Sequence, residues 1–63
     1  MQEKMQEAVD WALNQKYELD GELVIVSKET PHFLVEKVRE YLNRHAIEYD
    51  SFCYEDLIPY LPQ

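Results

Sequence analysis

The chain has 63 residues, 46% of them apolar, with 13 acidic and 6 basic side chains and a formal net charge of −7. This length allows one small domain, residues 1–63, and the apolar fraction is too high for a disordered chain. The acidic balance argues against direct binding to nucleic acid or to an anionic membrane, since both require Lys and Arg against phosphates.

Two further features of the sequence bear on the cellular compartment in which the protein is expected. Cys53 is the only cysteine, so no internal disulfide can form, and a lone thiol is typical of a reducing, cytoplasmic location. Residues 1–7 are polar and contain no apolar stretch of signal-peptide length. The longest strongly apolar run, Leu23 to Val26, is far too short to cross a membrane.

Residues 2–16 predict a helix whose apolar side chains share one face. Polar residues fill the rest of its surface, and Glu3 and Glu7 suit the positive N-terminal end. The apolar stripe consists of Met5, Ala8, Val9, Ala12 and Leu13.

Asp20–Gly21 is the strongest turn signal in the chain. The run from Leu23 to Val26 follows it and predicts a strand, apolar on both faces as in a strand that is covered on both sides. Residues 17–19 have two interpretations. They either pair back on this strand as a very short hairpin or form the loop that ends the first helix.

Thr30–Pro31 predicts the start of a second helix. The Thr30 hydroxyl can accept a bond from an unpaired N–H of the first turn, and Pro31 lacks the N–H that would be unpaired there. Residues 43–45 predict its end, and Glu40–Arg44 is a favourable pair one turn apart. The expected buried face comprises Leu34, Val35, Val38, Tyr41, Leu42 and His45.

Residues 46–53 predict a second strand, because Ile47 and Tyr49 alternate with Glu48 and Asp50. Residues 54–61 predict a short half-helix that its prolines keep from extending. A helix of about 14 residues returns the chain to the end where the first strand began, so we expect a parallel, right-handed strand–helix–strand unit. The predicted fold class is α/β (or α+β): a two-layer or three-layer domain in the order helix, strand, helix, strand.

The stretch Val24-Ile25-Val26-Ser27-Lys28-Glu29-Thr30-Pro31-His32-Phe33, followed by residues 34–43 and Ile47-Glu48-Tyr49, resembles the first strand–helix–strand unit of the glutaredoxin and thioredoxin-like families. The resemblance spans roughly half of the chain and implies the same parallel geometry. Those families carry Cys-x-x-Cys, or one cysteine, where the strand meets the helix. Here that place holds residues 29–33 without a cysteine, which argues against redox chemistry at this position.

The residues that can carry chemistry are few. Cys53 is a candidate nucleophile with His45 as its base, but its neighbours are acidic and disfavour the thiolate, so we expect a small buried side chain at a strand end. His32 and His45 are expected on different faces of one helix, which does not suit a metal site. Gly21 is the only glycine, so no phosphate-binding loop is present, and we expect no cofactor.

Aromatic residues and acids suggest a function in binding. Residues 46–63 contain four acids and no Lys or Arg. Aromatic side chains on a polar surface are typical anchors of protein interfaces. We therefore expect a non-enzymatic protein-interaction module, a small acidic regulator or inhibitor that binds another protein, for which the acids suit a basic partner. The expected partner-binding residues are Trp11, Phe33, Glu48, Asp50, Tyr54, Glu55, Asp56 and Tyr60.

Three alternatives differ in what they require. A nucleic-acid mimic that occupies the basic groove of a DNA- or RNA-binding protein requires a regular row of acids. A thiol enzyme, or a fragment of a thioredoxin-like protein, requires a reactive Cys53. A homodimer requires an open sheet edge that a second copy can pair with.

Overall fold

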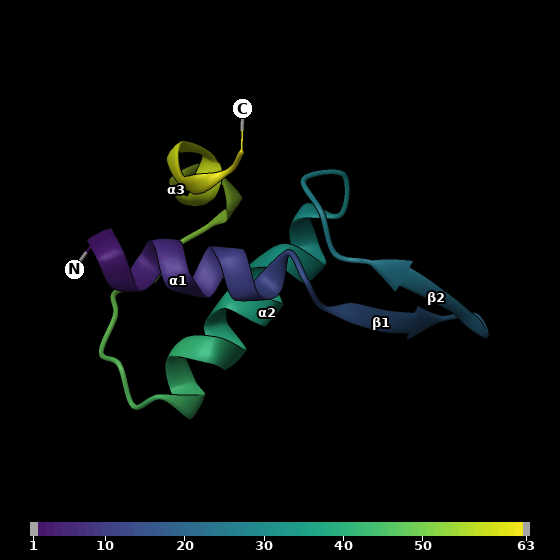
Figure 1. Cartoon of the computed structure of the whole chain (residues 1–63), viewed down its shortest axis with the longest axis horizontal. Helices are drawn as coiled ribbons and strands as arrows, with labels where there is room; N and C mark the ends of the chain where they lie inside the picture. The colour runs from purple at the N-terminus through teal and green to yellow at the C-terminus, as the bar shows by residue number, and fades with distance from the viewer. Residues whose placement is uncertain (1, 63) are drawn as a thin grey trace.

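The computed structural model describes residues 2–62, in which helices and one hairpin follow the order α1–β1–β2–α2–α3–η1 (Figure 1). The bounds are Gln2–Ala12 for α1, Lys16–Leu19 for β1, Glu22–Ile25 for β2, Pro31–Arg44 for α2, Tyr54–Leu57 for α3 and Ile58–Tyr60 for the 3-10 helix η1. The fold is a mixed α+β arrangement. No helix in this part of the chain is both long and apolar enough to span a bilayer.

The core lies where α1 packs against α2 and where the C-terminal helices cover both. The predicted apolar stripes of the two long helices are confirmed at their centres, since their small and aliphatic residues are fully buried. One prediction is wrong: His45 is exposed, not part of the buried face. The buried residues are Ala8, Val9, Ala12, Val26, Leu34, Val38, Leu42, Leu57 and Leu61.

Helix α1 ends at Ala12, four residues earlier than expected. Two polar side chains explain this early end. The Asn14 amide donates to the carbonyl of Asp10 at 2.9 Å, and the Gln15 amide donates to the carbonyl of Trp11 at 3.2 Å. Both side chains bond to carbonyls of the last turn, although the Trp11 carbonyl also accepts from the Asn14 N–H at 3.1 Å.

Helix α2 spans the predicted residues, with Pro31 in its first turn. Thr30 acts differently from the prediction, because its hydroxyl makes no cap hydrogen bond to the helix. Instead its Oγ1 accepts from the Ser27 N–H at 2.9 Å and donates to the Ser27 carbonyl at 3.1 Å. The side chain therefore closes the turn that leads from β2 into α2.

At its C-terminus α2 ends in the bond pattern of a Schellman motif. The Ile47 N–H donates to the Leu42 carbonyl at 2.9 Å, and the Ala46 N–H donates to the Asn43 carbonyl at 3.2 Å. Ala46 occupies the left-handed position with φ 54°. Glycine usually takes this position, so the chain reverses here at some conformational cost.

The strands form an antiparallel hairpin, so the expected parallel strand–helix–strand unit is wrong. Asp20 and Gly21 both have positive φ, 53° and 85°, which the two-residue type I′ turn requires. Of the two interpretations of residues 17–19, the short hairpin is therefore correct. The tight turn places β1 directly beside β2 as its pairing partner, so no crossover connection lies between the two strands.

Residues 46–53 form no strand, contrary to the prediction. Ile47 and Tyr49 are half-buried and Glu48 and Asp50 exposed, so the alternation marks an extended segment packed on the helices. In Figure 1 this segment passes the N-terminal half of α1 and leads up to α3. It does not approach β2, and the strand–helix–strand geometry implied by the thioredoxin-like resemblance is therefore absent.

The C-terminal helices close the core. Leu57 and Leu61 are buried, whereas Ile58 between them is 47% exposed. The hairpin, by contrast, projects away from the helices (Figure 1). The candidate site lies on this projecting hairpin, outside the closed helical body.

Candidate interaction surface

All four predicted aromatic anchors are half-buried against the core, and two of them also make ring contacts. The half-buried Trp11 ring lies 5.5 Å from the Tyr41 ring, and the Arg44 guanidinium lies over it at 5.7 Å. Phe33 is also half-buried and stacks on Tyr17 at 3.5 Å between ring centroids. The sequence placed Phe33 among exposed polar residues of the helix. In the structure the hairpin supplies Tyr17 as its partner.

The Phe33–Tyr17 stack joins α2 to the base of the hairpin. Desolvation by this packing raises the pKa of the Tyr17 phenol above its ordinary value of 10.0, because burial disfavours the phenolate. The stack orients the hairpin, and only the outer part of Phe33 remains available to a partner.

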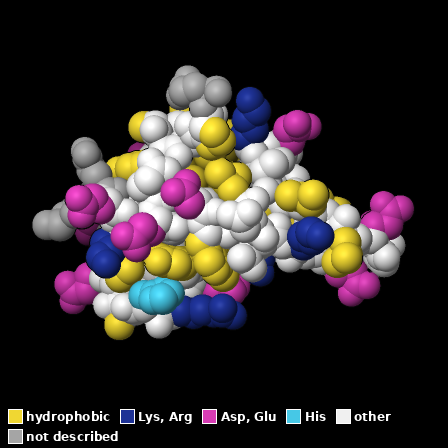
Figure 2. Space-filling view, viewed as in Figure 1, with side chains coloured by type: hydrophobic (Ala, Val, Ile, Leu, Met, Phe, Trp, Pro, Cys, Tyr) yellow, Lys and Arg dark blue, Asp and Glu magenta, His cyan; other side chains and the backbone are white. Residues whose placement is uncertain are grey.

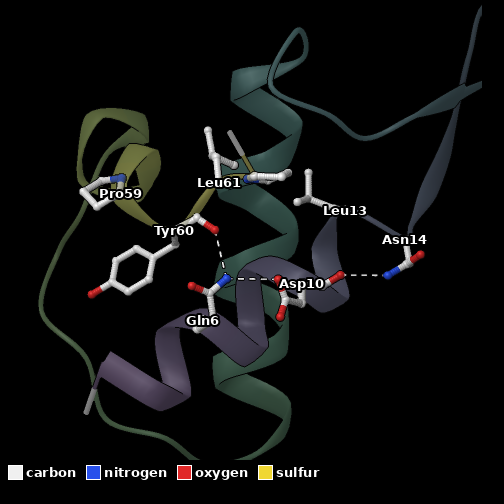
Figure 3. Close-up of a pocket in the computed structure, with 8 residues that line it drawn as sticks. Gln6, Asp10, Leu13, Asn14, Pro59, Tyr60 and Leu61 are labelled. Carbon is white, nitrogen blue, oxygen red and sulfur yellow. Dashed lines mark hydrogen bonds between the residues drawn. The ribbon is translucent and has the colours of Figure 1, made fainter.

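Tyr54 and Tyr60 lie elsewhere. The Tyr54 hydroxyl donates to the Lys28 carbonyl at 3.4 Å, next to the loop that follows β2. Tyr60 borders a shallow groove of about 500 Å³ between α1 and the C-terminal segment. Figure 3 shows the Gln6 amide at this groove, where it donates to the Tyr60 carbonyl at 2.9 Å and to Asp10 at 3.0 Å. No ring contact within residues 2–62 joins two of the four predicted anchors.

All four acids of the C-terminal third are exposed, and they fall into two groups. Glu48 and Asp50 lie on the extended segment beside a shallow hollow. Glu55 and Asp56 lie in the first turn of α3. Asp56 also has a structural role, because its carboxylate accepts the Cys53 N–H at 2.9 Å and completes a capping box.

Cys53 is exposed at the N-cap of α3, not buried at a strand end as predicted. Its Sγ lies 3.6 Å from Asp56 and 3.8 Å from Glu55. Both neighbours are carboxylates. His45 stacks on Tyr41 at the end of α2. Within the described residues, no three His, Cys, Asp or Glu side chains are grouped so that they could hold a metal ion.

The hairpin carries apolar surface that the sequence analysis missed. The register pairs Lys16 with Ile25 and Glu18 with Leu23, so these four side chains share one face. We call them the open hairpin face. Leu23 is 73% exposed and Ile25 is 60% exposed. Figure 2 shows apolar surface on the projecting hairpin between basic and acidic side chains.

The other hairpin face is directed differently. Tyr17 and Val24 are paired there and are half-buried, and Tyr17 meets Phe33. Leu19, near the turn, is 47% exposed. The signal that could have revealed the open face is the run Leu23 to Val26, whose residues are apolar on both faces. We interpreted this pattern as cover on both sides, whereas the described chain covers only one.

Comparisons with known proteins find no matching family model, no similar curated protein and no similar solved structure.

Proposed function

We propose that the protein is a non-enzymatic protein-interaction module of the cytoplasm, a small acidic regulator or inhibitor that binds another protein through the open hairpin face. One observation carries the proposal: Leu23 and Ile25 lie on the same face of a projecting arm, 73% and 60% exposed. Burial of one such aliphatic side chain stabilises a complex by about 1.5–3 kcal/mol.

Charged residues border the apolar pair. Lys16 and Glu18 stand across the hairpin from Ile25 and Leu23, and Asp20 and Glu22 lie at the turn. A dry centre with a polar rim is the usual anatomy of a protein interface. The net charge of −7 favours a basic partner, and exposed acids such as Glu48 and Asp50 raise the rate of association with it.

The predicted aromatic anchors take a secondary place in this proposal. Trp11 and Phe33 are half-buried and offer only an edge. Tyr60 borders its own groove. A mimic of nucleic acid is less well supported, because the C-terminal acids form two separate groups and the open hairpin face has an apolar centre.

The test is affinity capture from the native host with three immobilised full-length chains: the unchanged protein, the double variant Leu23→Lys/Ile25→Lys, and the control Ile58→Lys. Ile58 is an aliphatic residue of η1, outside the hairpin, and is 47% exposed. We expect a partner that the unchanged protein and the control retain and the double variant loses. Circular dichroism checks that all three remain folded.

A partner retained equally by all three chains would contradict the proposed surface. A salt series on the captured complex addresses the mimic. Nucleic-acid mimicry would be favoured instead if moderate salt removed nearly all binding and the double variant still bound the partner at low salt.

A further inference from the structure

Independently of the proposed function, the edge of β2 that faces away from β1 can pair with a further strand. The Val26 N–H donates to the Gln15 carbonyl at 3.0 Å, which makes this a hydrogen-bonded pair at the base of the hairpin. Such pairs alternate along an antiparallel ladder. The backbone groups of Val24 therefore face β1, whereas those of Leu23 and Ile25 point outward.

The two edges of the hairpin differ in how well they are protected. On β1 the residues with outward backbone groups are Lys16 and Glu18, and charged side chains deter pairing at an edge. On β2 they are Leu23 and Ile25, which carry no charge. The sheet of the described chain has only two strands, and a two-stranded hairpin is marginal by itself. The β2 edge is thus the one open to a third strand.

We propose that two copies of this chain pair antiparallel through β2, about a two-fold axis at Val24, to form a four-stranded sheet. In this register Leu23 of each copy lies opposite Ile25 of the other. The N–H and C=O groups of both residues then find partners in both copies. The residue pairs are self-complementary, as a two-fold interface requires.

Charge supports a second copy as the occupant. The hairpin is acidic near its turn, where Glu18, Asp20 and Glu22 lie, whereas its base carries Lys16, and the following loop carries the exposed Lys28 next to the exposed Glu29. In the register centred on Val24, antiparallel pairing brings Asp20 of each copy toward Lys28 of the other. Opposite charges then meet at both ends of the interface, although each copy is acidic as a whole.

The test is sedimentation equilibrium of the full chain over a range of concentrations. We expect the mass to rise from 7.6 kDa toward twice that value. Leu23→Lys should weaken the dimer by about tenfold or more, a free-energy change of about 1.4 kcal/mol. Leu19→Lys is the matched control, since it adds the same charge to the same hairpin on the other strand and face. It should leave the dimer intact.

Amide exchange locates the contact. With rising concentration the amides of Leu23 and Ile25 should become protected, while that of Glu18 on the β1 edge should not. A chain that stays monomeric up to a concentration on the order of 1 mM would overturn the proposal. So would a dimer that Leu23→Lys leaves unchanged or that protects Glu18. Capture of a host protein by a strictly monomeric chain would retain the proposed function and remove only the dimer.

Discussion

Asp20, Gly21 and Ala46 have positive φ, a conformation that favours glycine, but only Gly21 is a glycine. Gly21 has φ 85° in the hairpin turn, and Ala46 has φ 54° at the end of α2. A side chain in the left-handed region costs about 1 kcal/mol. Ala46 therefore carries a strain that Gly21 avoids, and these two positions make opposite predictions.

Ala46→Gly should raise the free energy of unfolding by about 0.5–1 kcal/mol, because the Schellman motif stays in place and the strain is removed. Gly21→Ala should lower it by about 1 kcal/mol. No atom lies within 4 Å of the added Cβ, so backbone strain alone accounts for that loss. Urea unfolding measures both. A destabilising Ala46→Gly would mean that the Ala46 methyl group contributes more through packing than it costs in strain.

At the scale of single elements, we expect the hairpin to depend on the stack of Phe33 on Tyr17, which the spacing of these residues in the sequence does not predict. Phe33→Ala removes the ring that packs on Tyr17 at 3.5 Å. We expect a loss of about 1–3 kcal/mol and faster amide exchange in β1 and β2 than in α2. His32→Ala, at an exposed neighbour, should change stability by less than about 0.5 kcal/mol. Unchanged hairpin exchange in Phe33→Ala would show that the stack does not hold the hairpin.

The elements also show what local sequence can and cannot predict. Pro31 and the stripe through Leu34, Val38 and Leu42 were sufficient to predict α2, because a helix forms its hydrogen bonds within itself. Strands depend on distant partners. The alternation from Ile47 to Asp50 reports burial on one side, yet no strand lies near enough to pair with it.

The same limit applies to the candidate site. Phe33 and Trp11 were predicted as exposed anchors, but their half-buried state follows from Tyr17 and Tyr41, which come from other elements. Ile25 was expected to be buried under other parts of the chain because it is aliphatic. Which face of a strand is covered depends on where the helices lie, and neighbouring residues do not encode that position.

At the scale of the molecule, one core joins the two ends of the chain. Helix α1 contributes Val9, α2 contributes Val38, and the C-terminal helices contribute Leu57 and Leu61. Buried residues so far apart in sequence make unfolding cooperative, because no element keeps its buried face without the others. Trp11, which contacts Tyr41 between α1 and α2, reports on this shared packing.

Leu57→Ala tests that cooperativity. Leu57 lies in the four-residue α3 and is fully buried, so its truncation should cost about 2–5 kcal/mol through lost transfer energy and a cavity. If the core is one unit, Trp11 fluorescence and far-ultraviolet circular dichroism should show the same shifted transition. Ile58→Ala, at the next residue and 47% exposed, should shift it much less. Two separate transitions, with Trp11 unaffected by Leu57→Ala, would instead divide the molecule into an independent helical pair and a C-terminal segment docked on its surface.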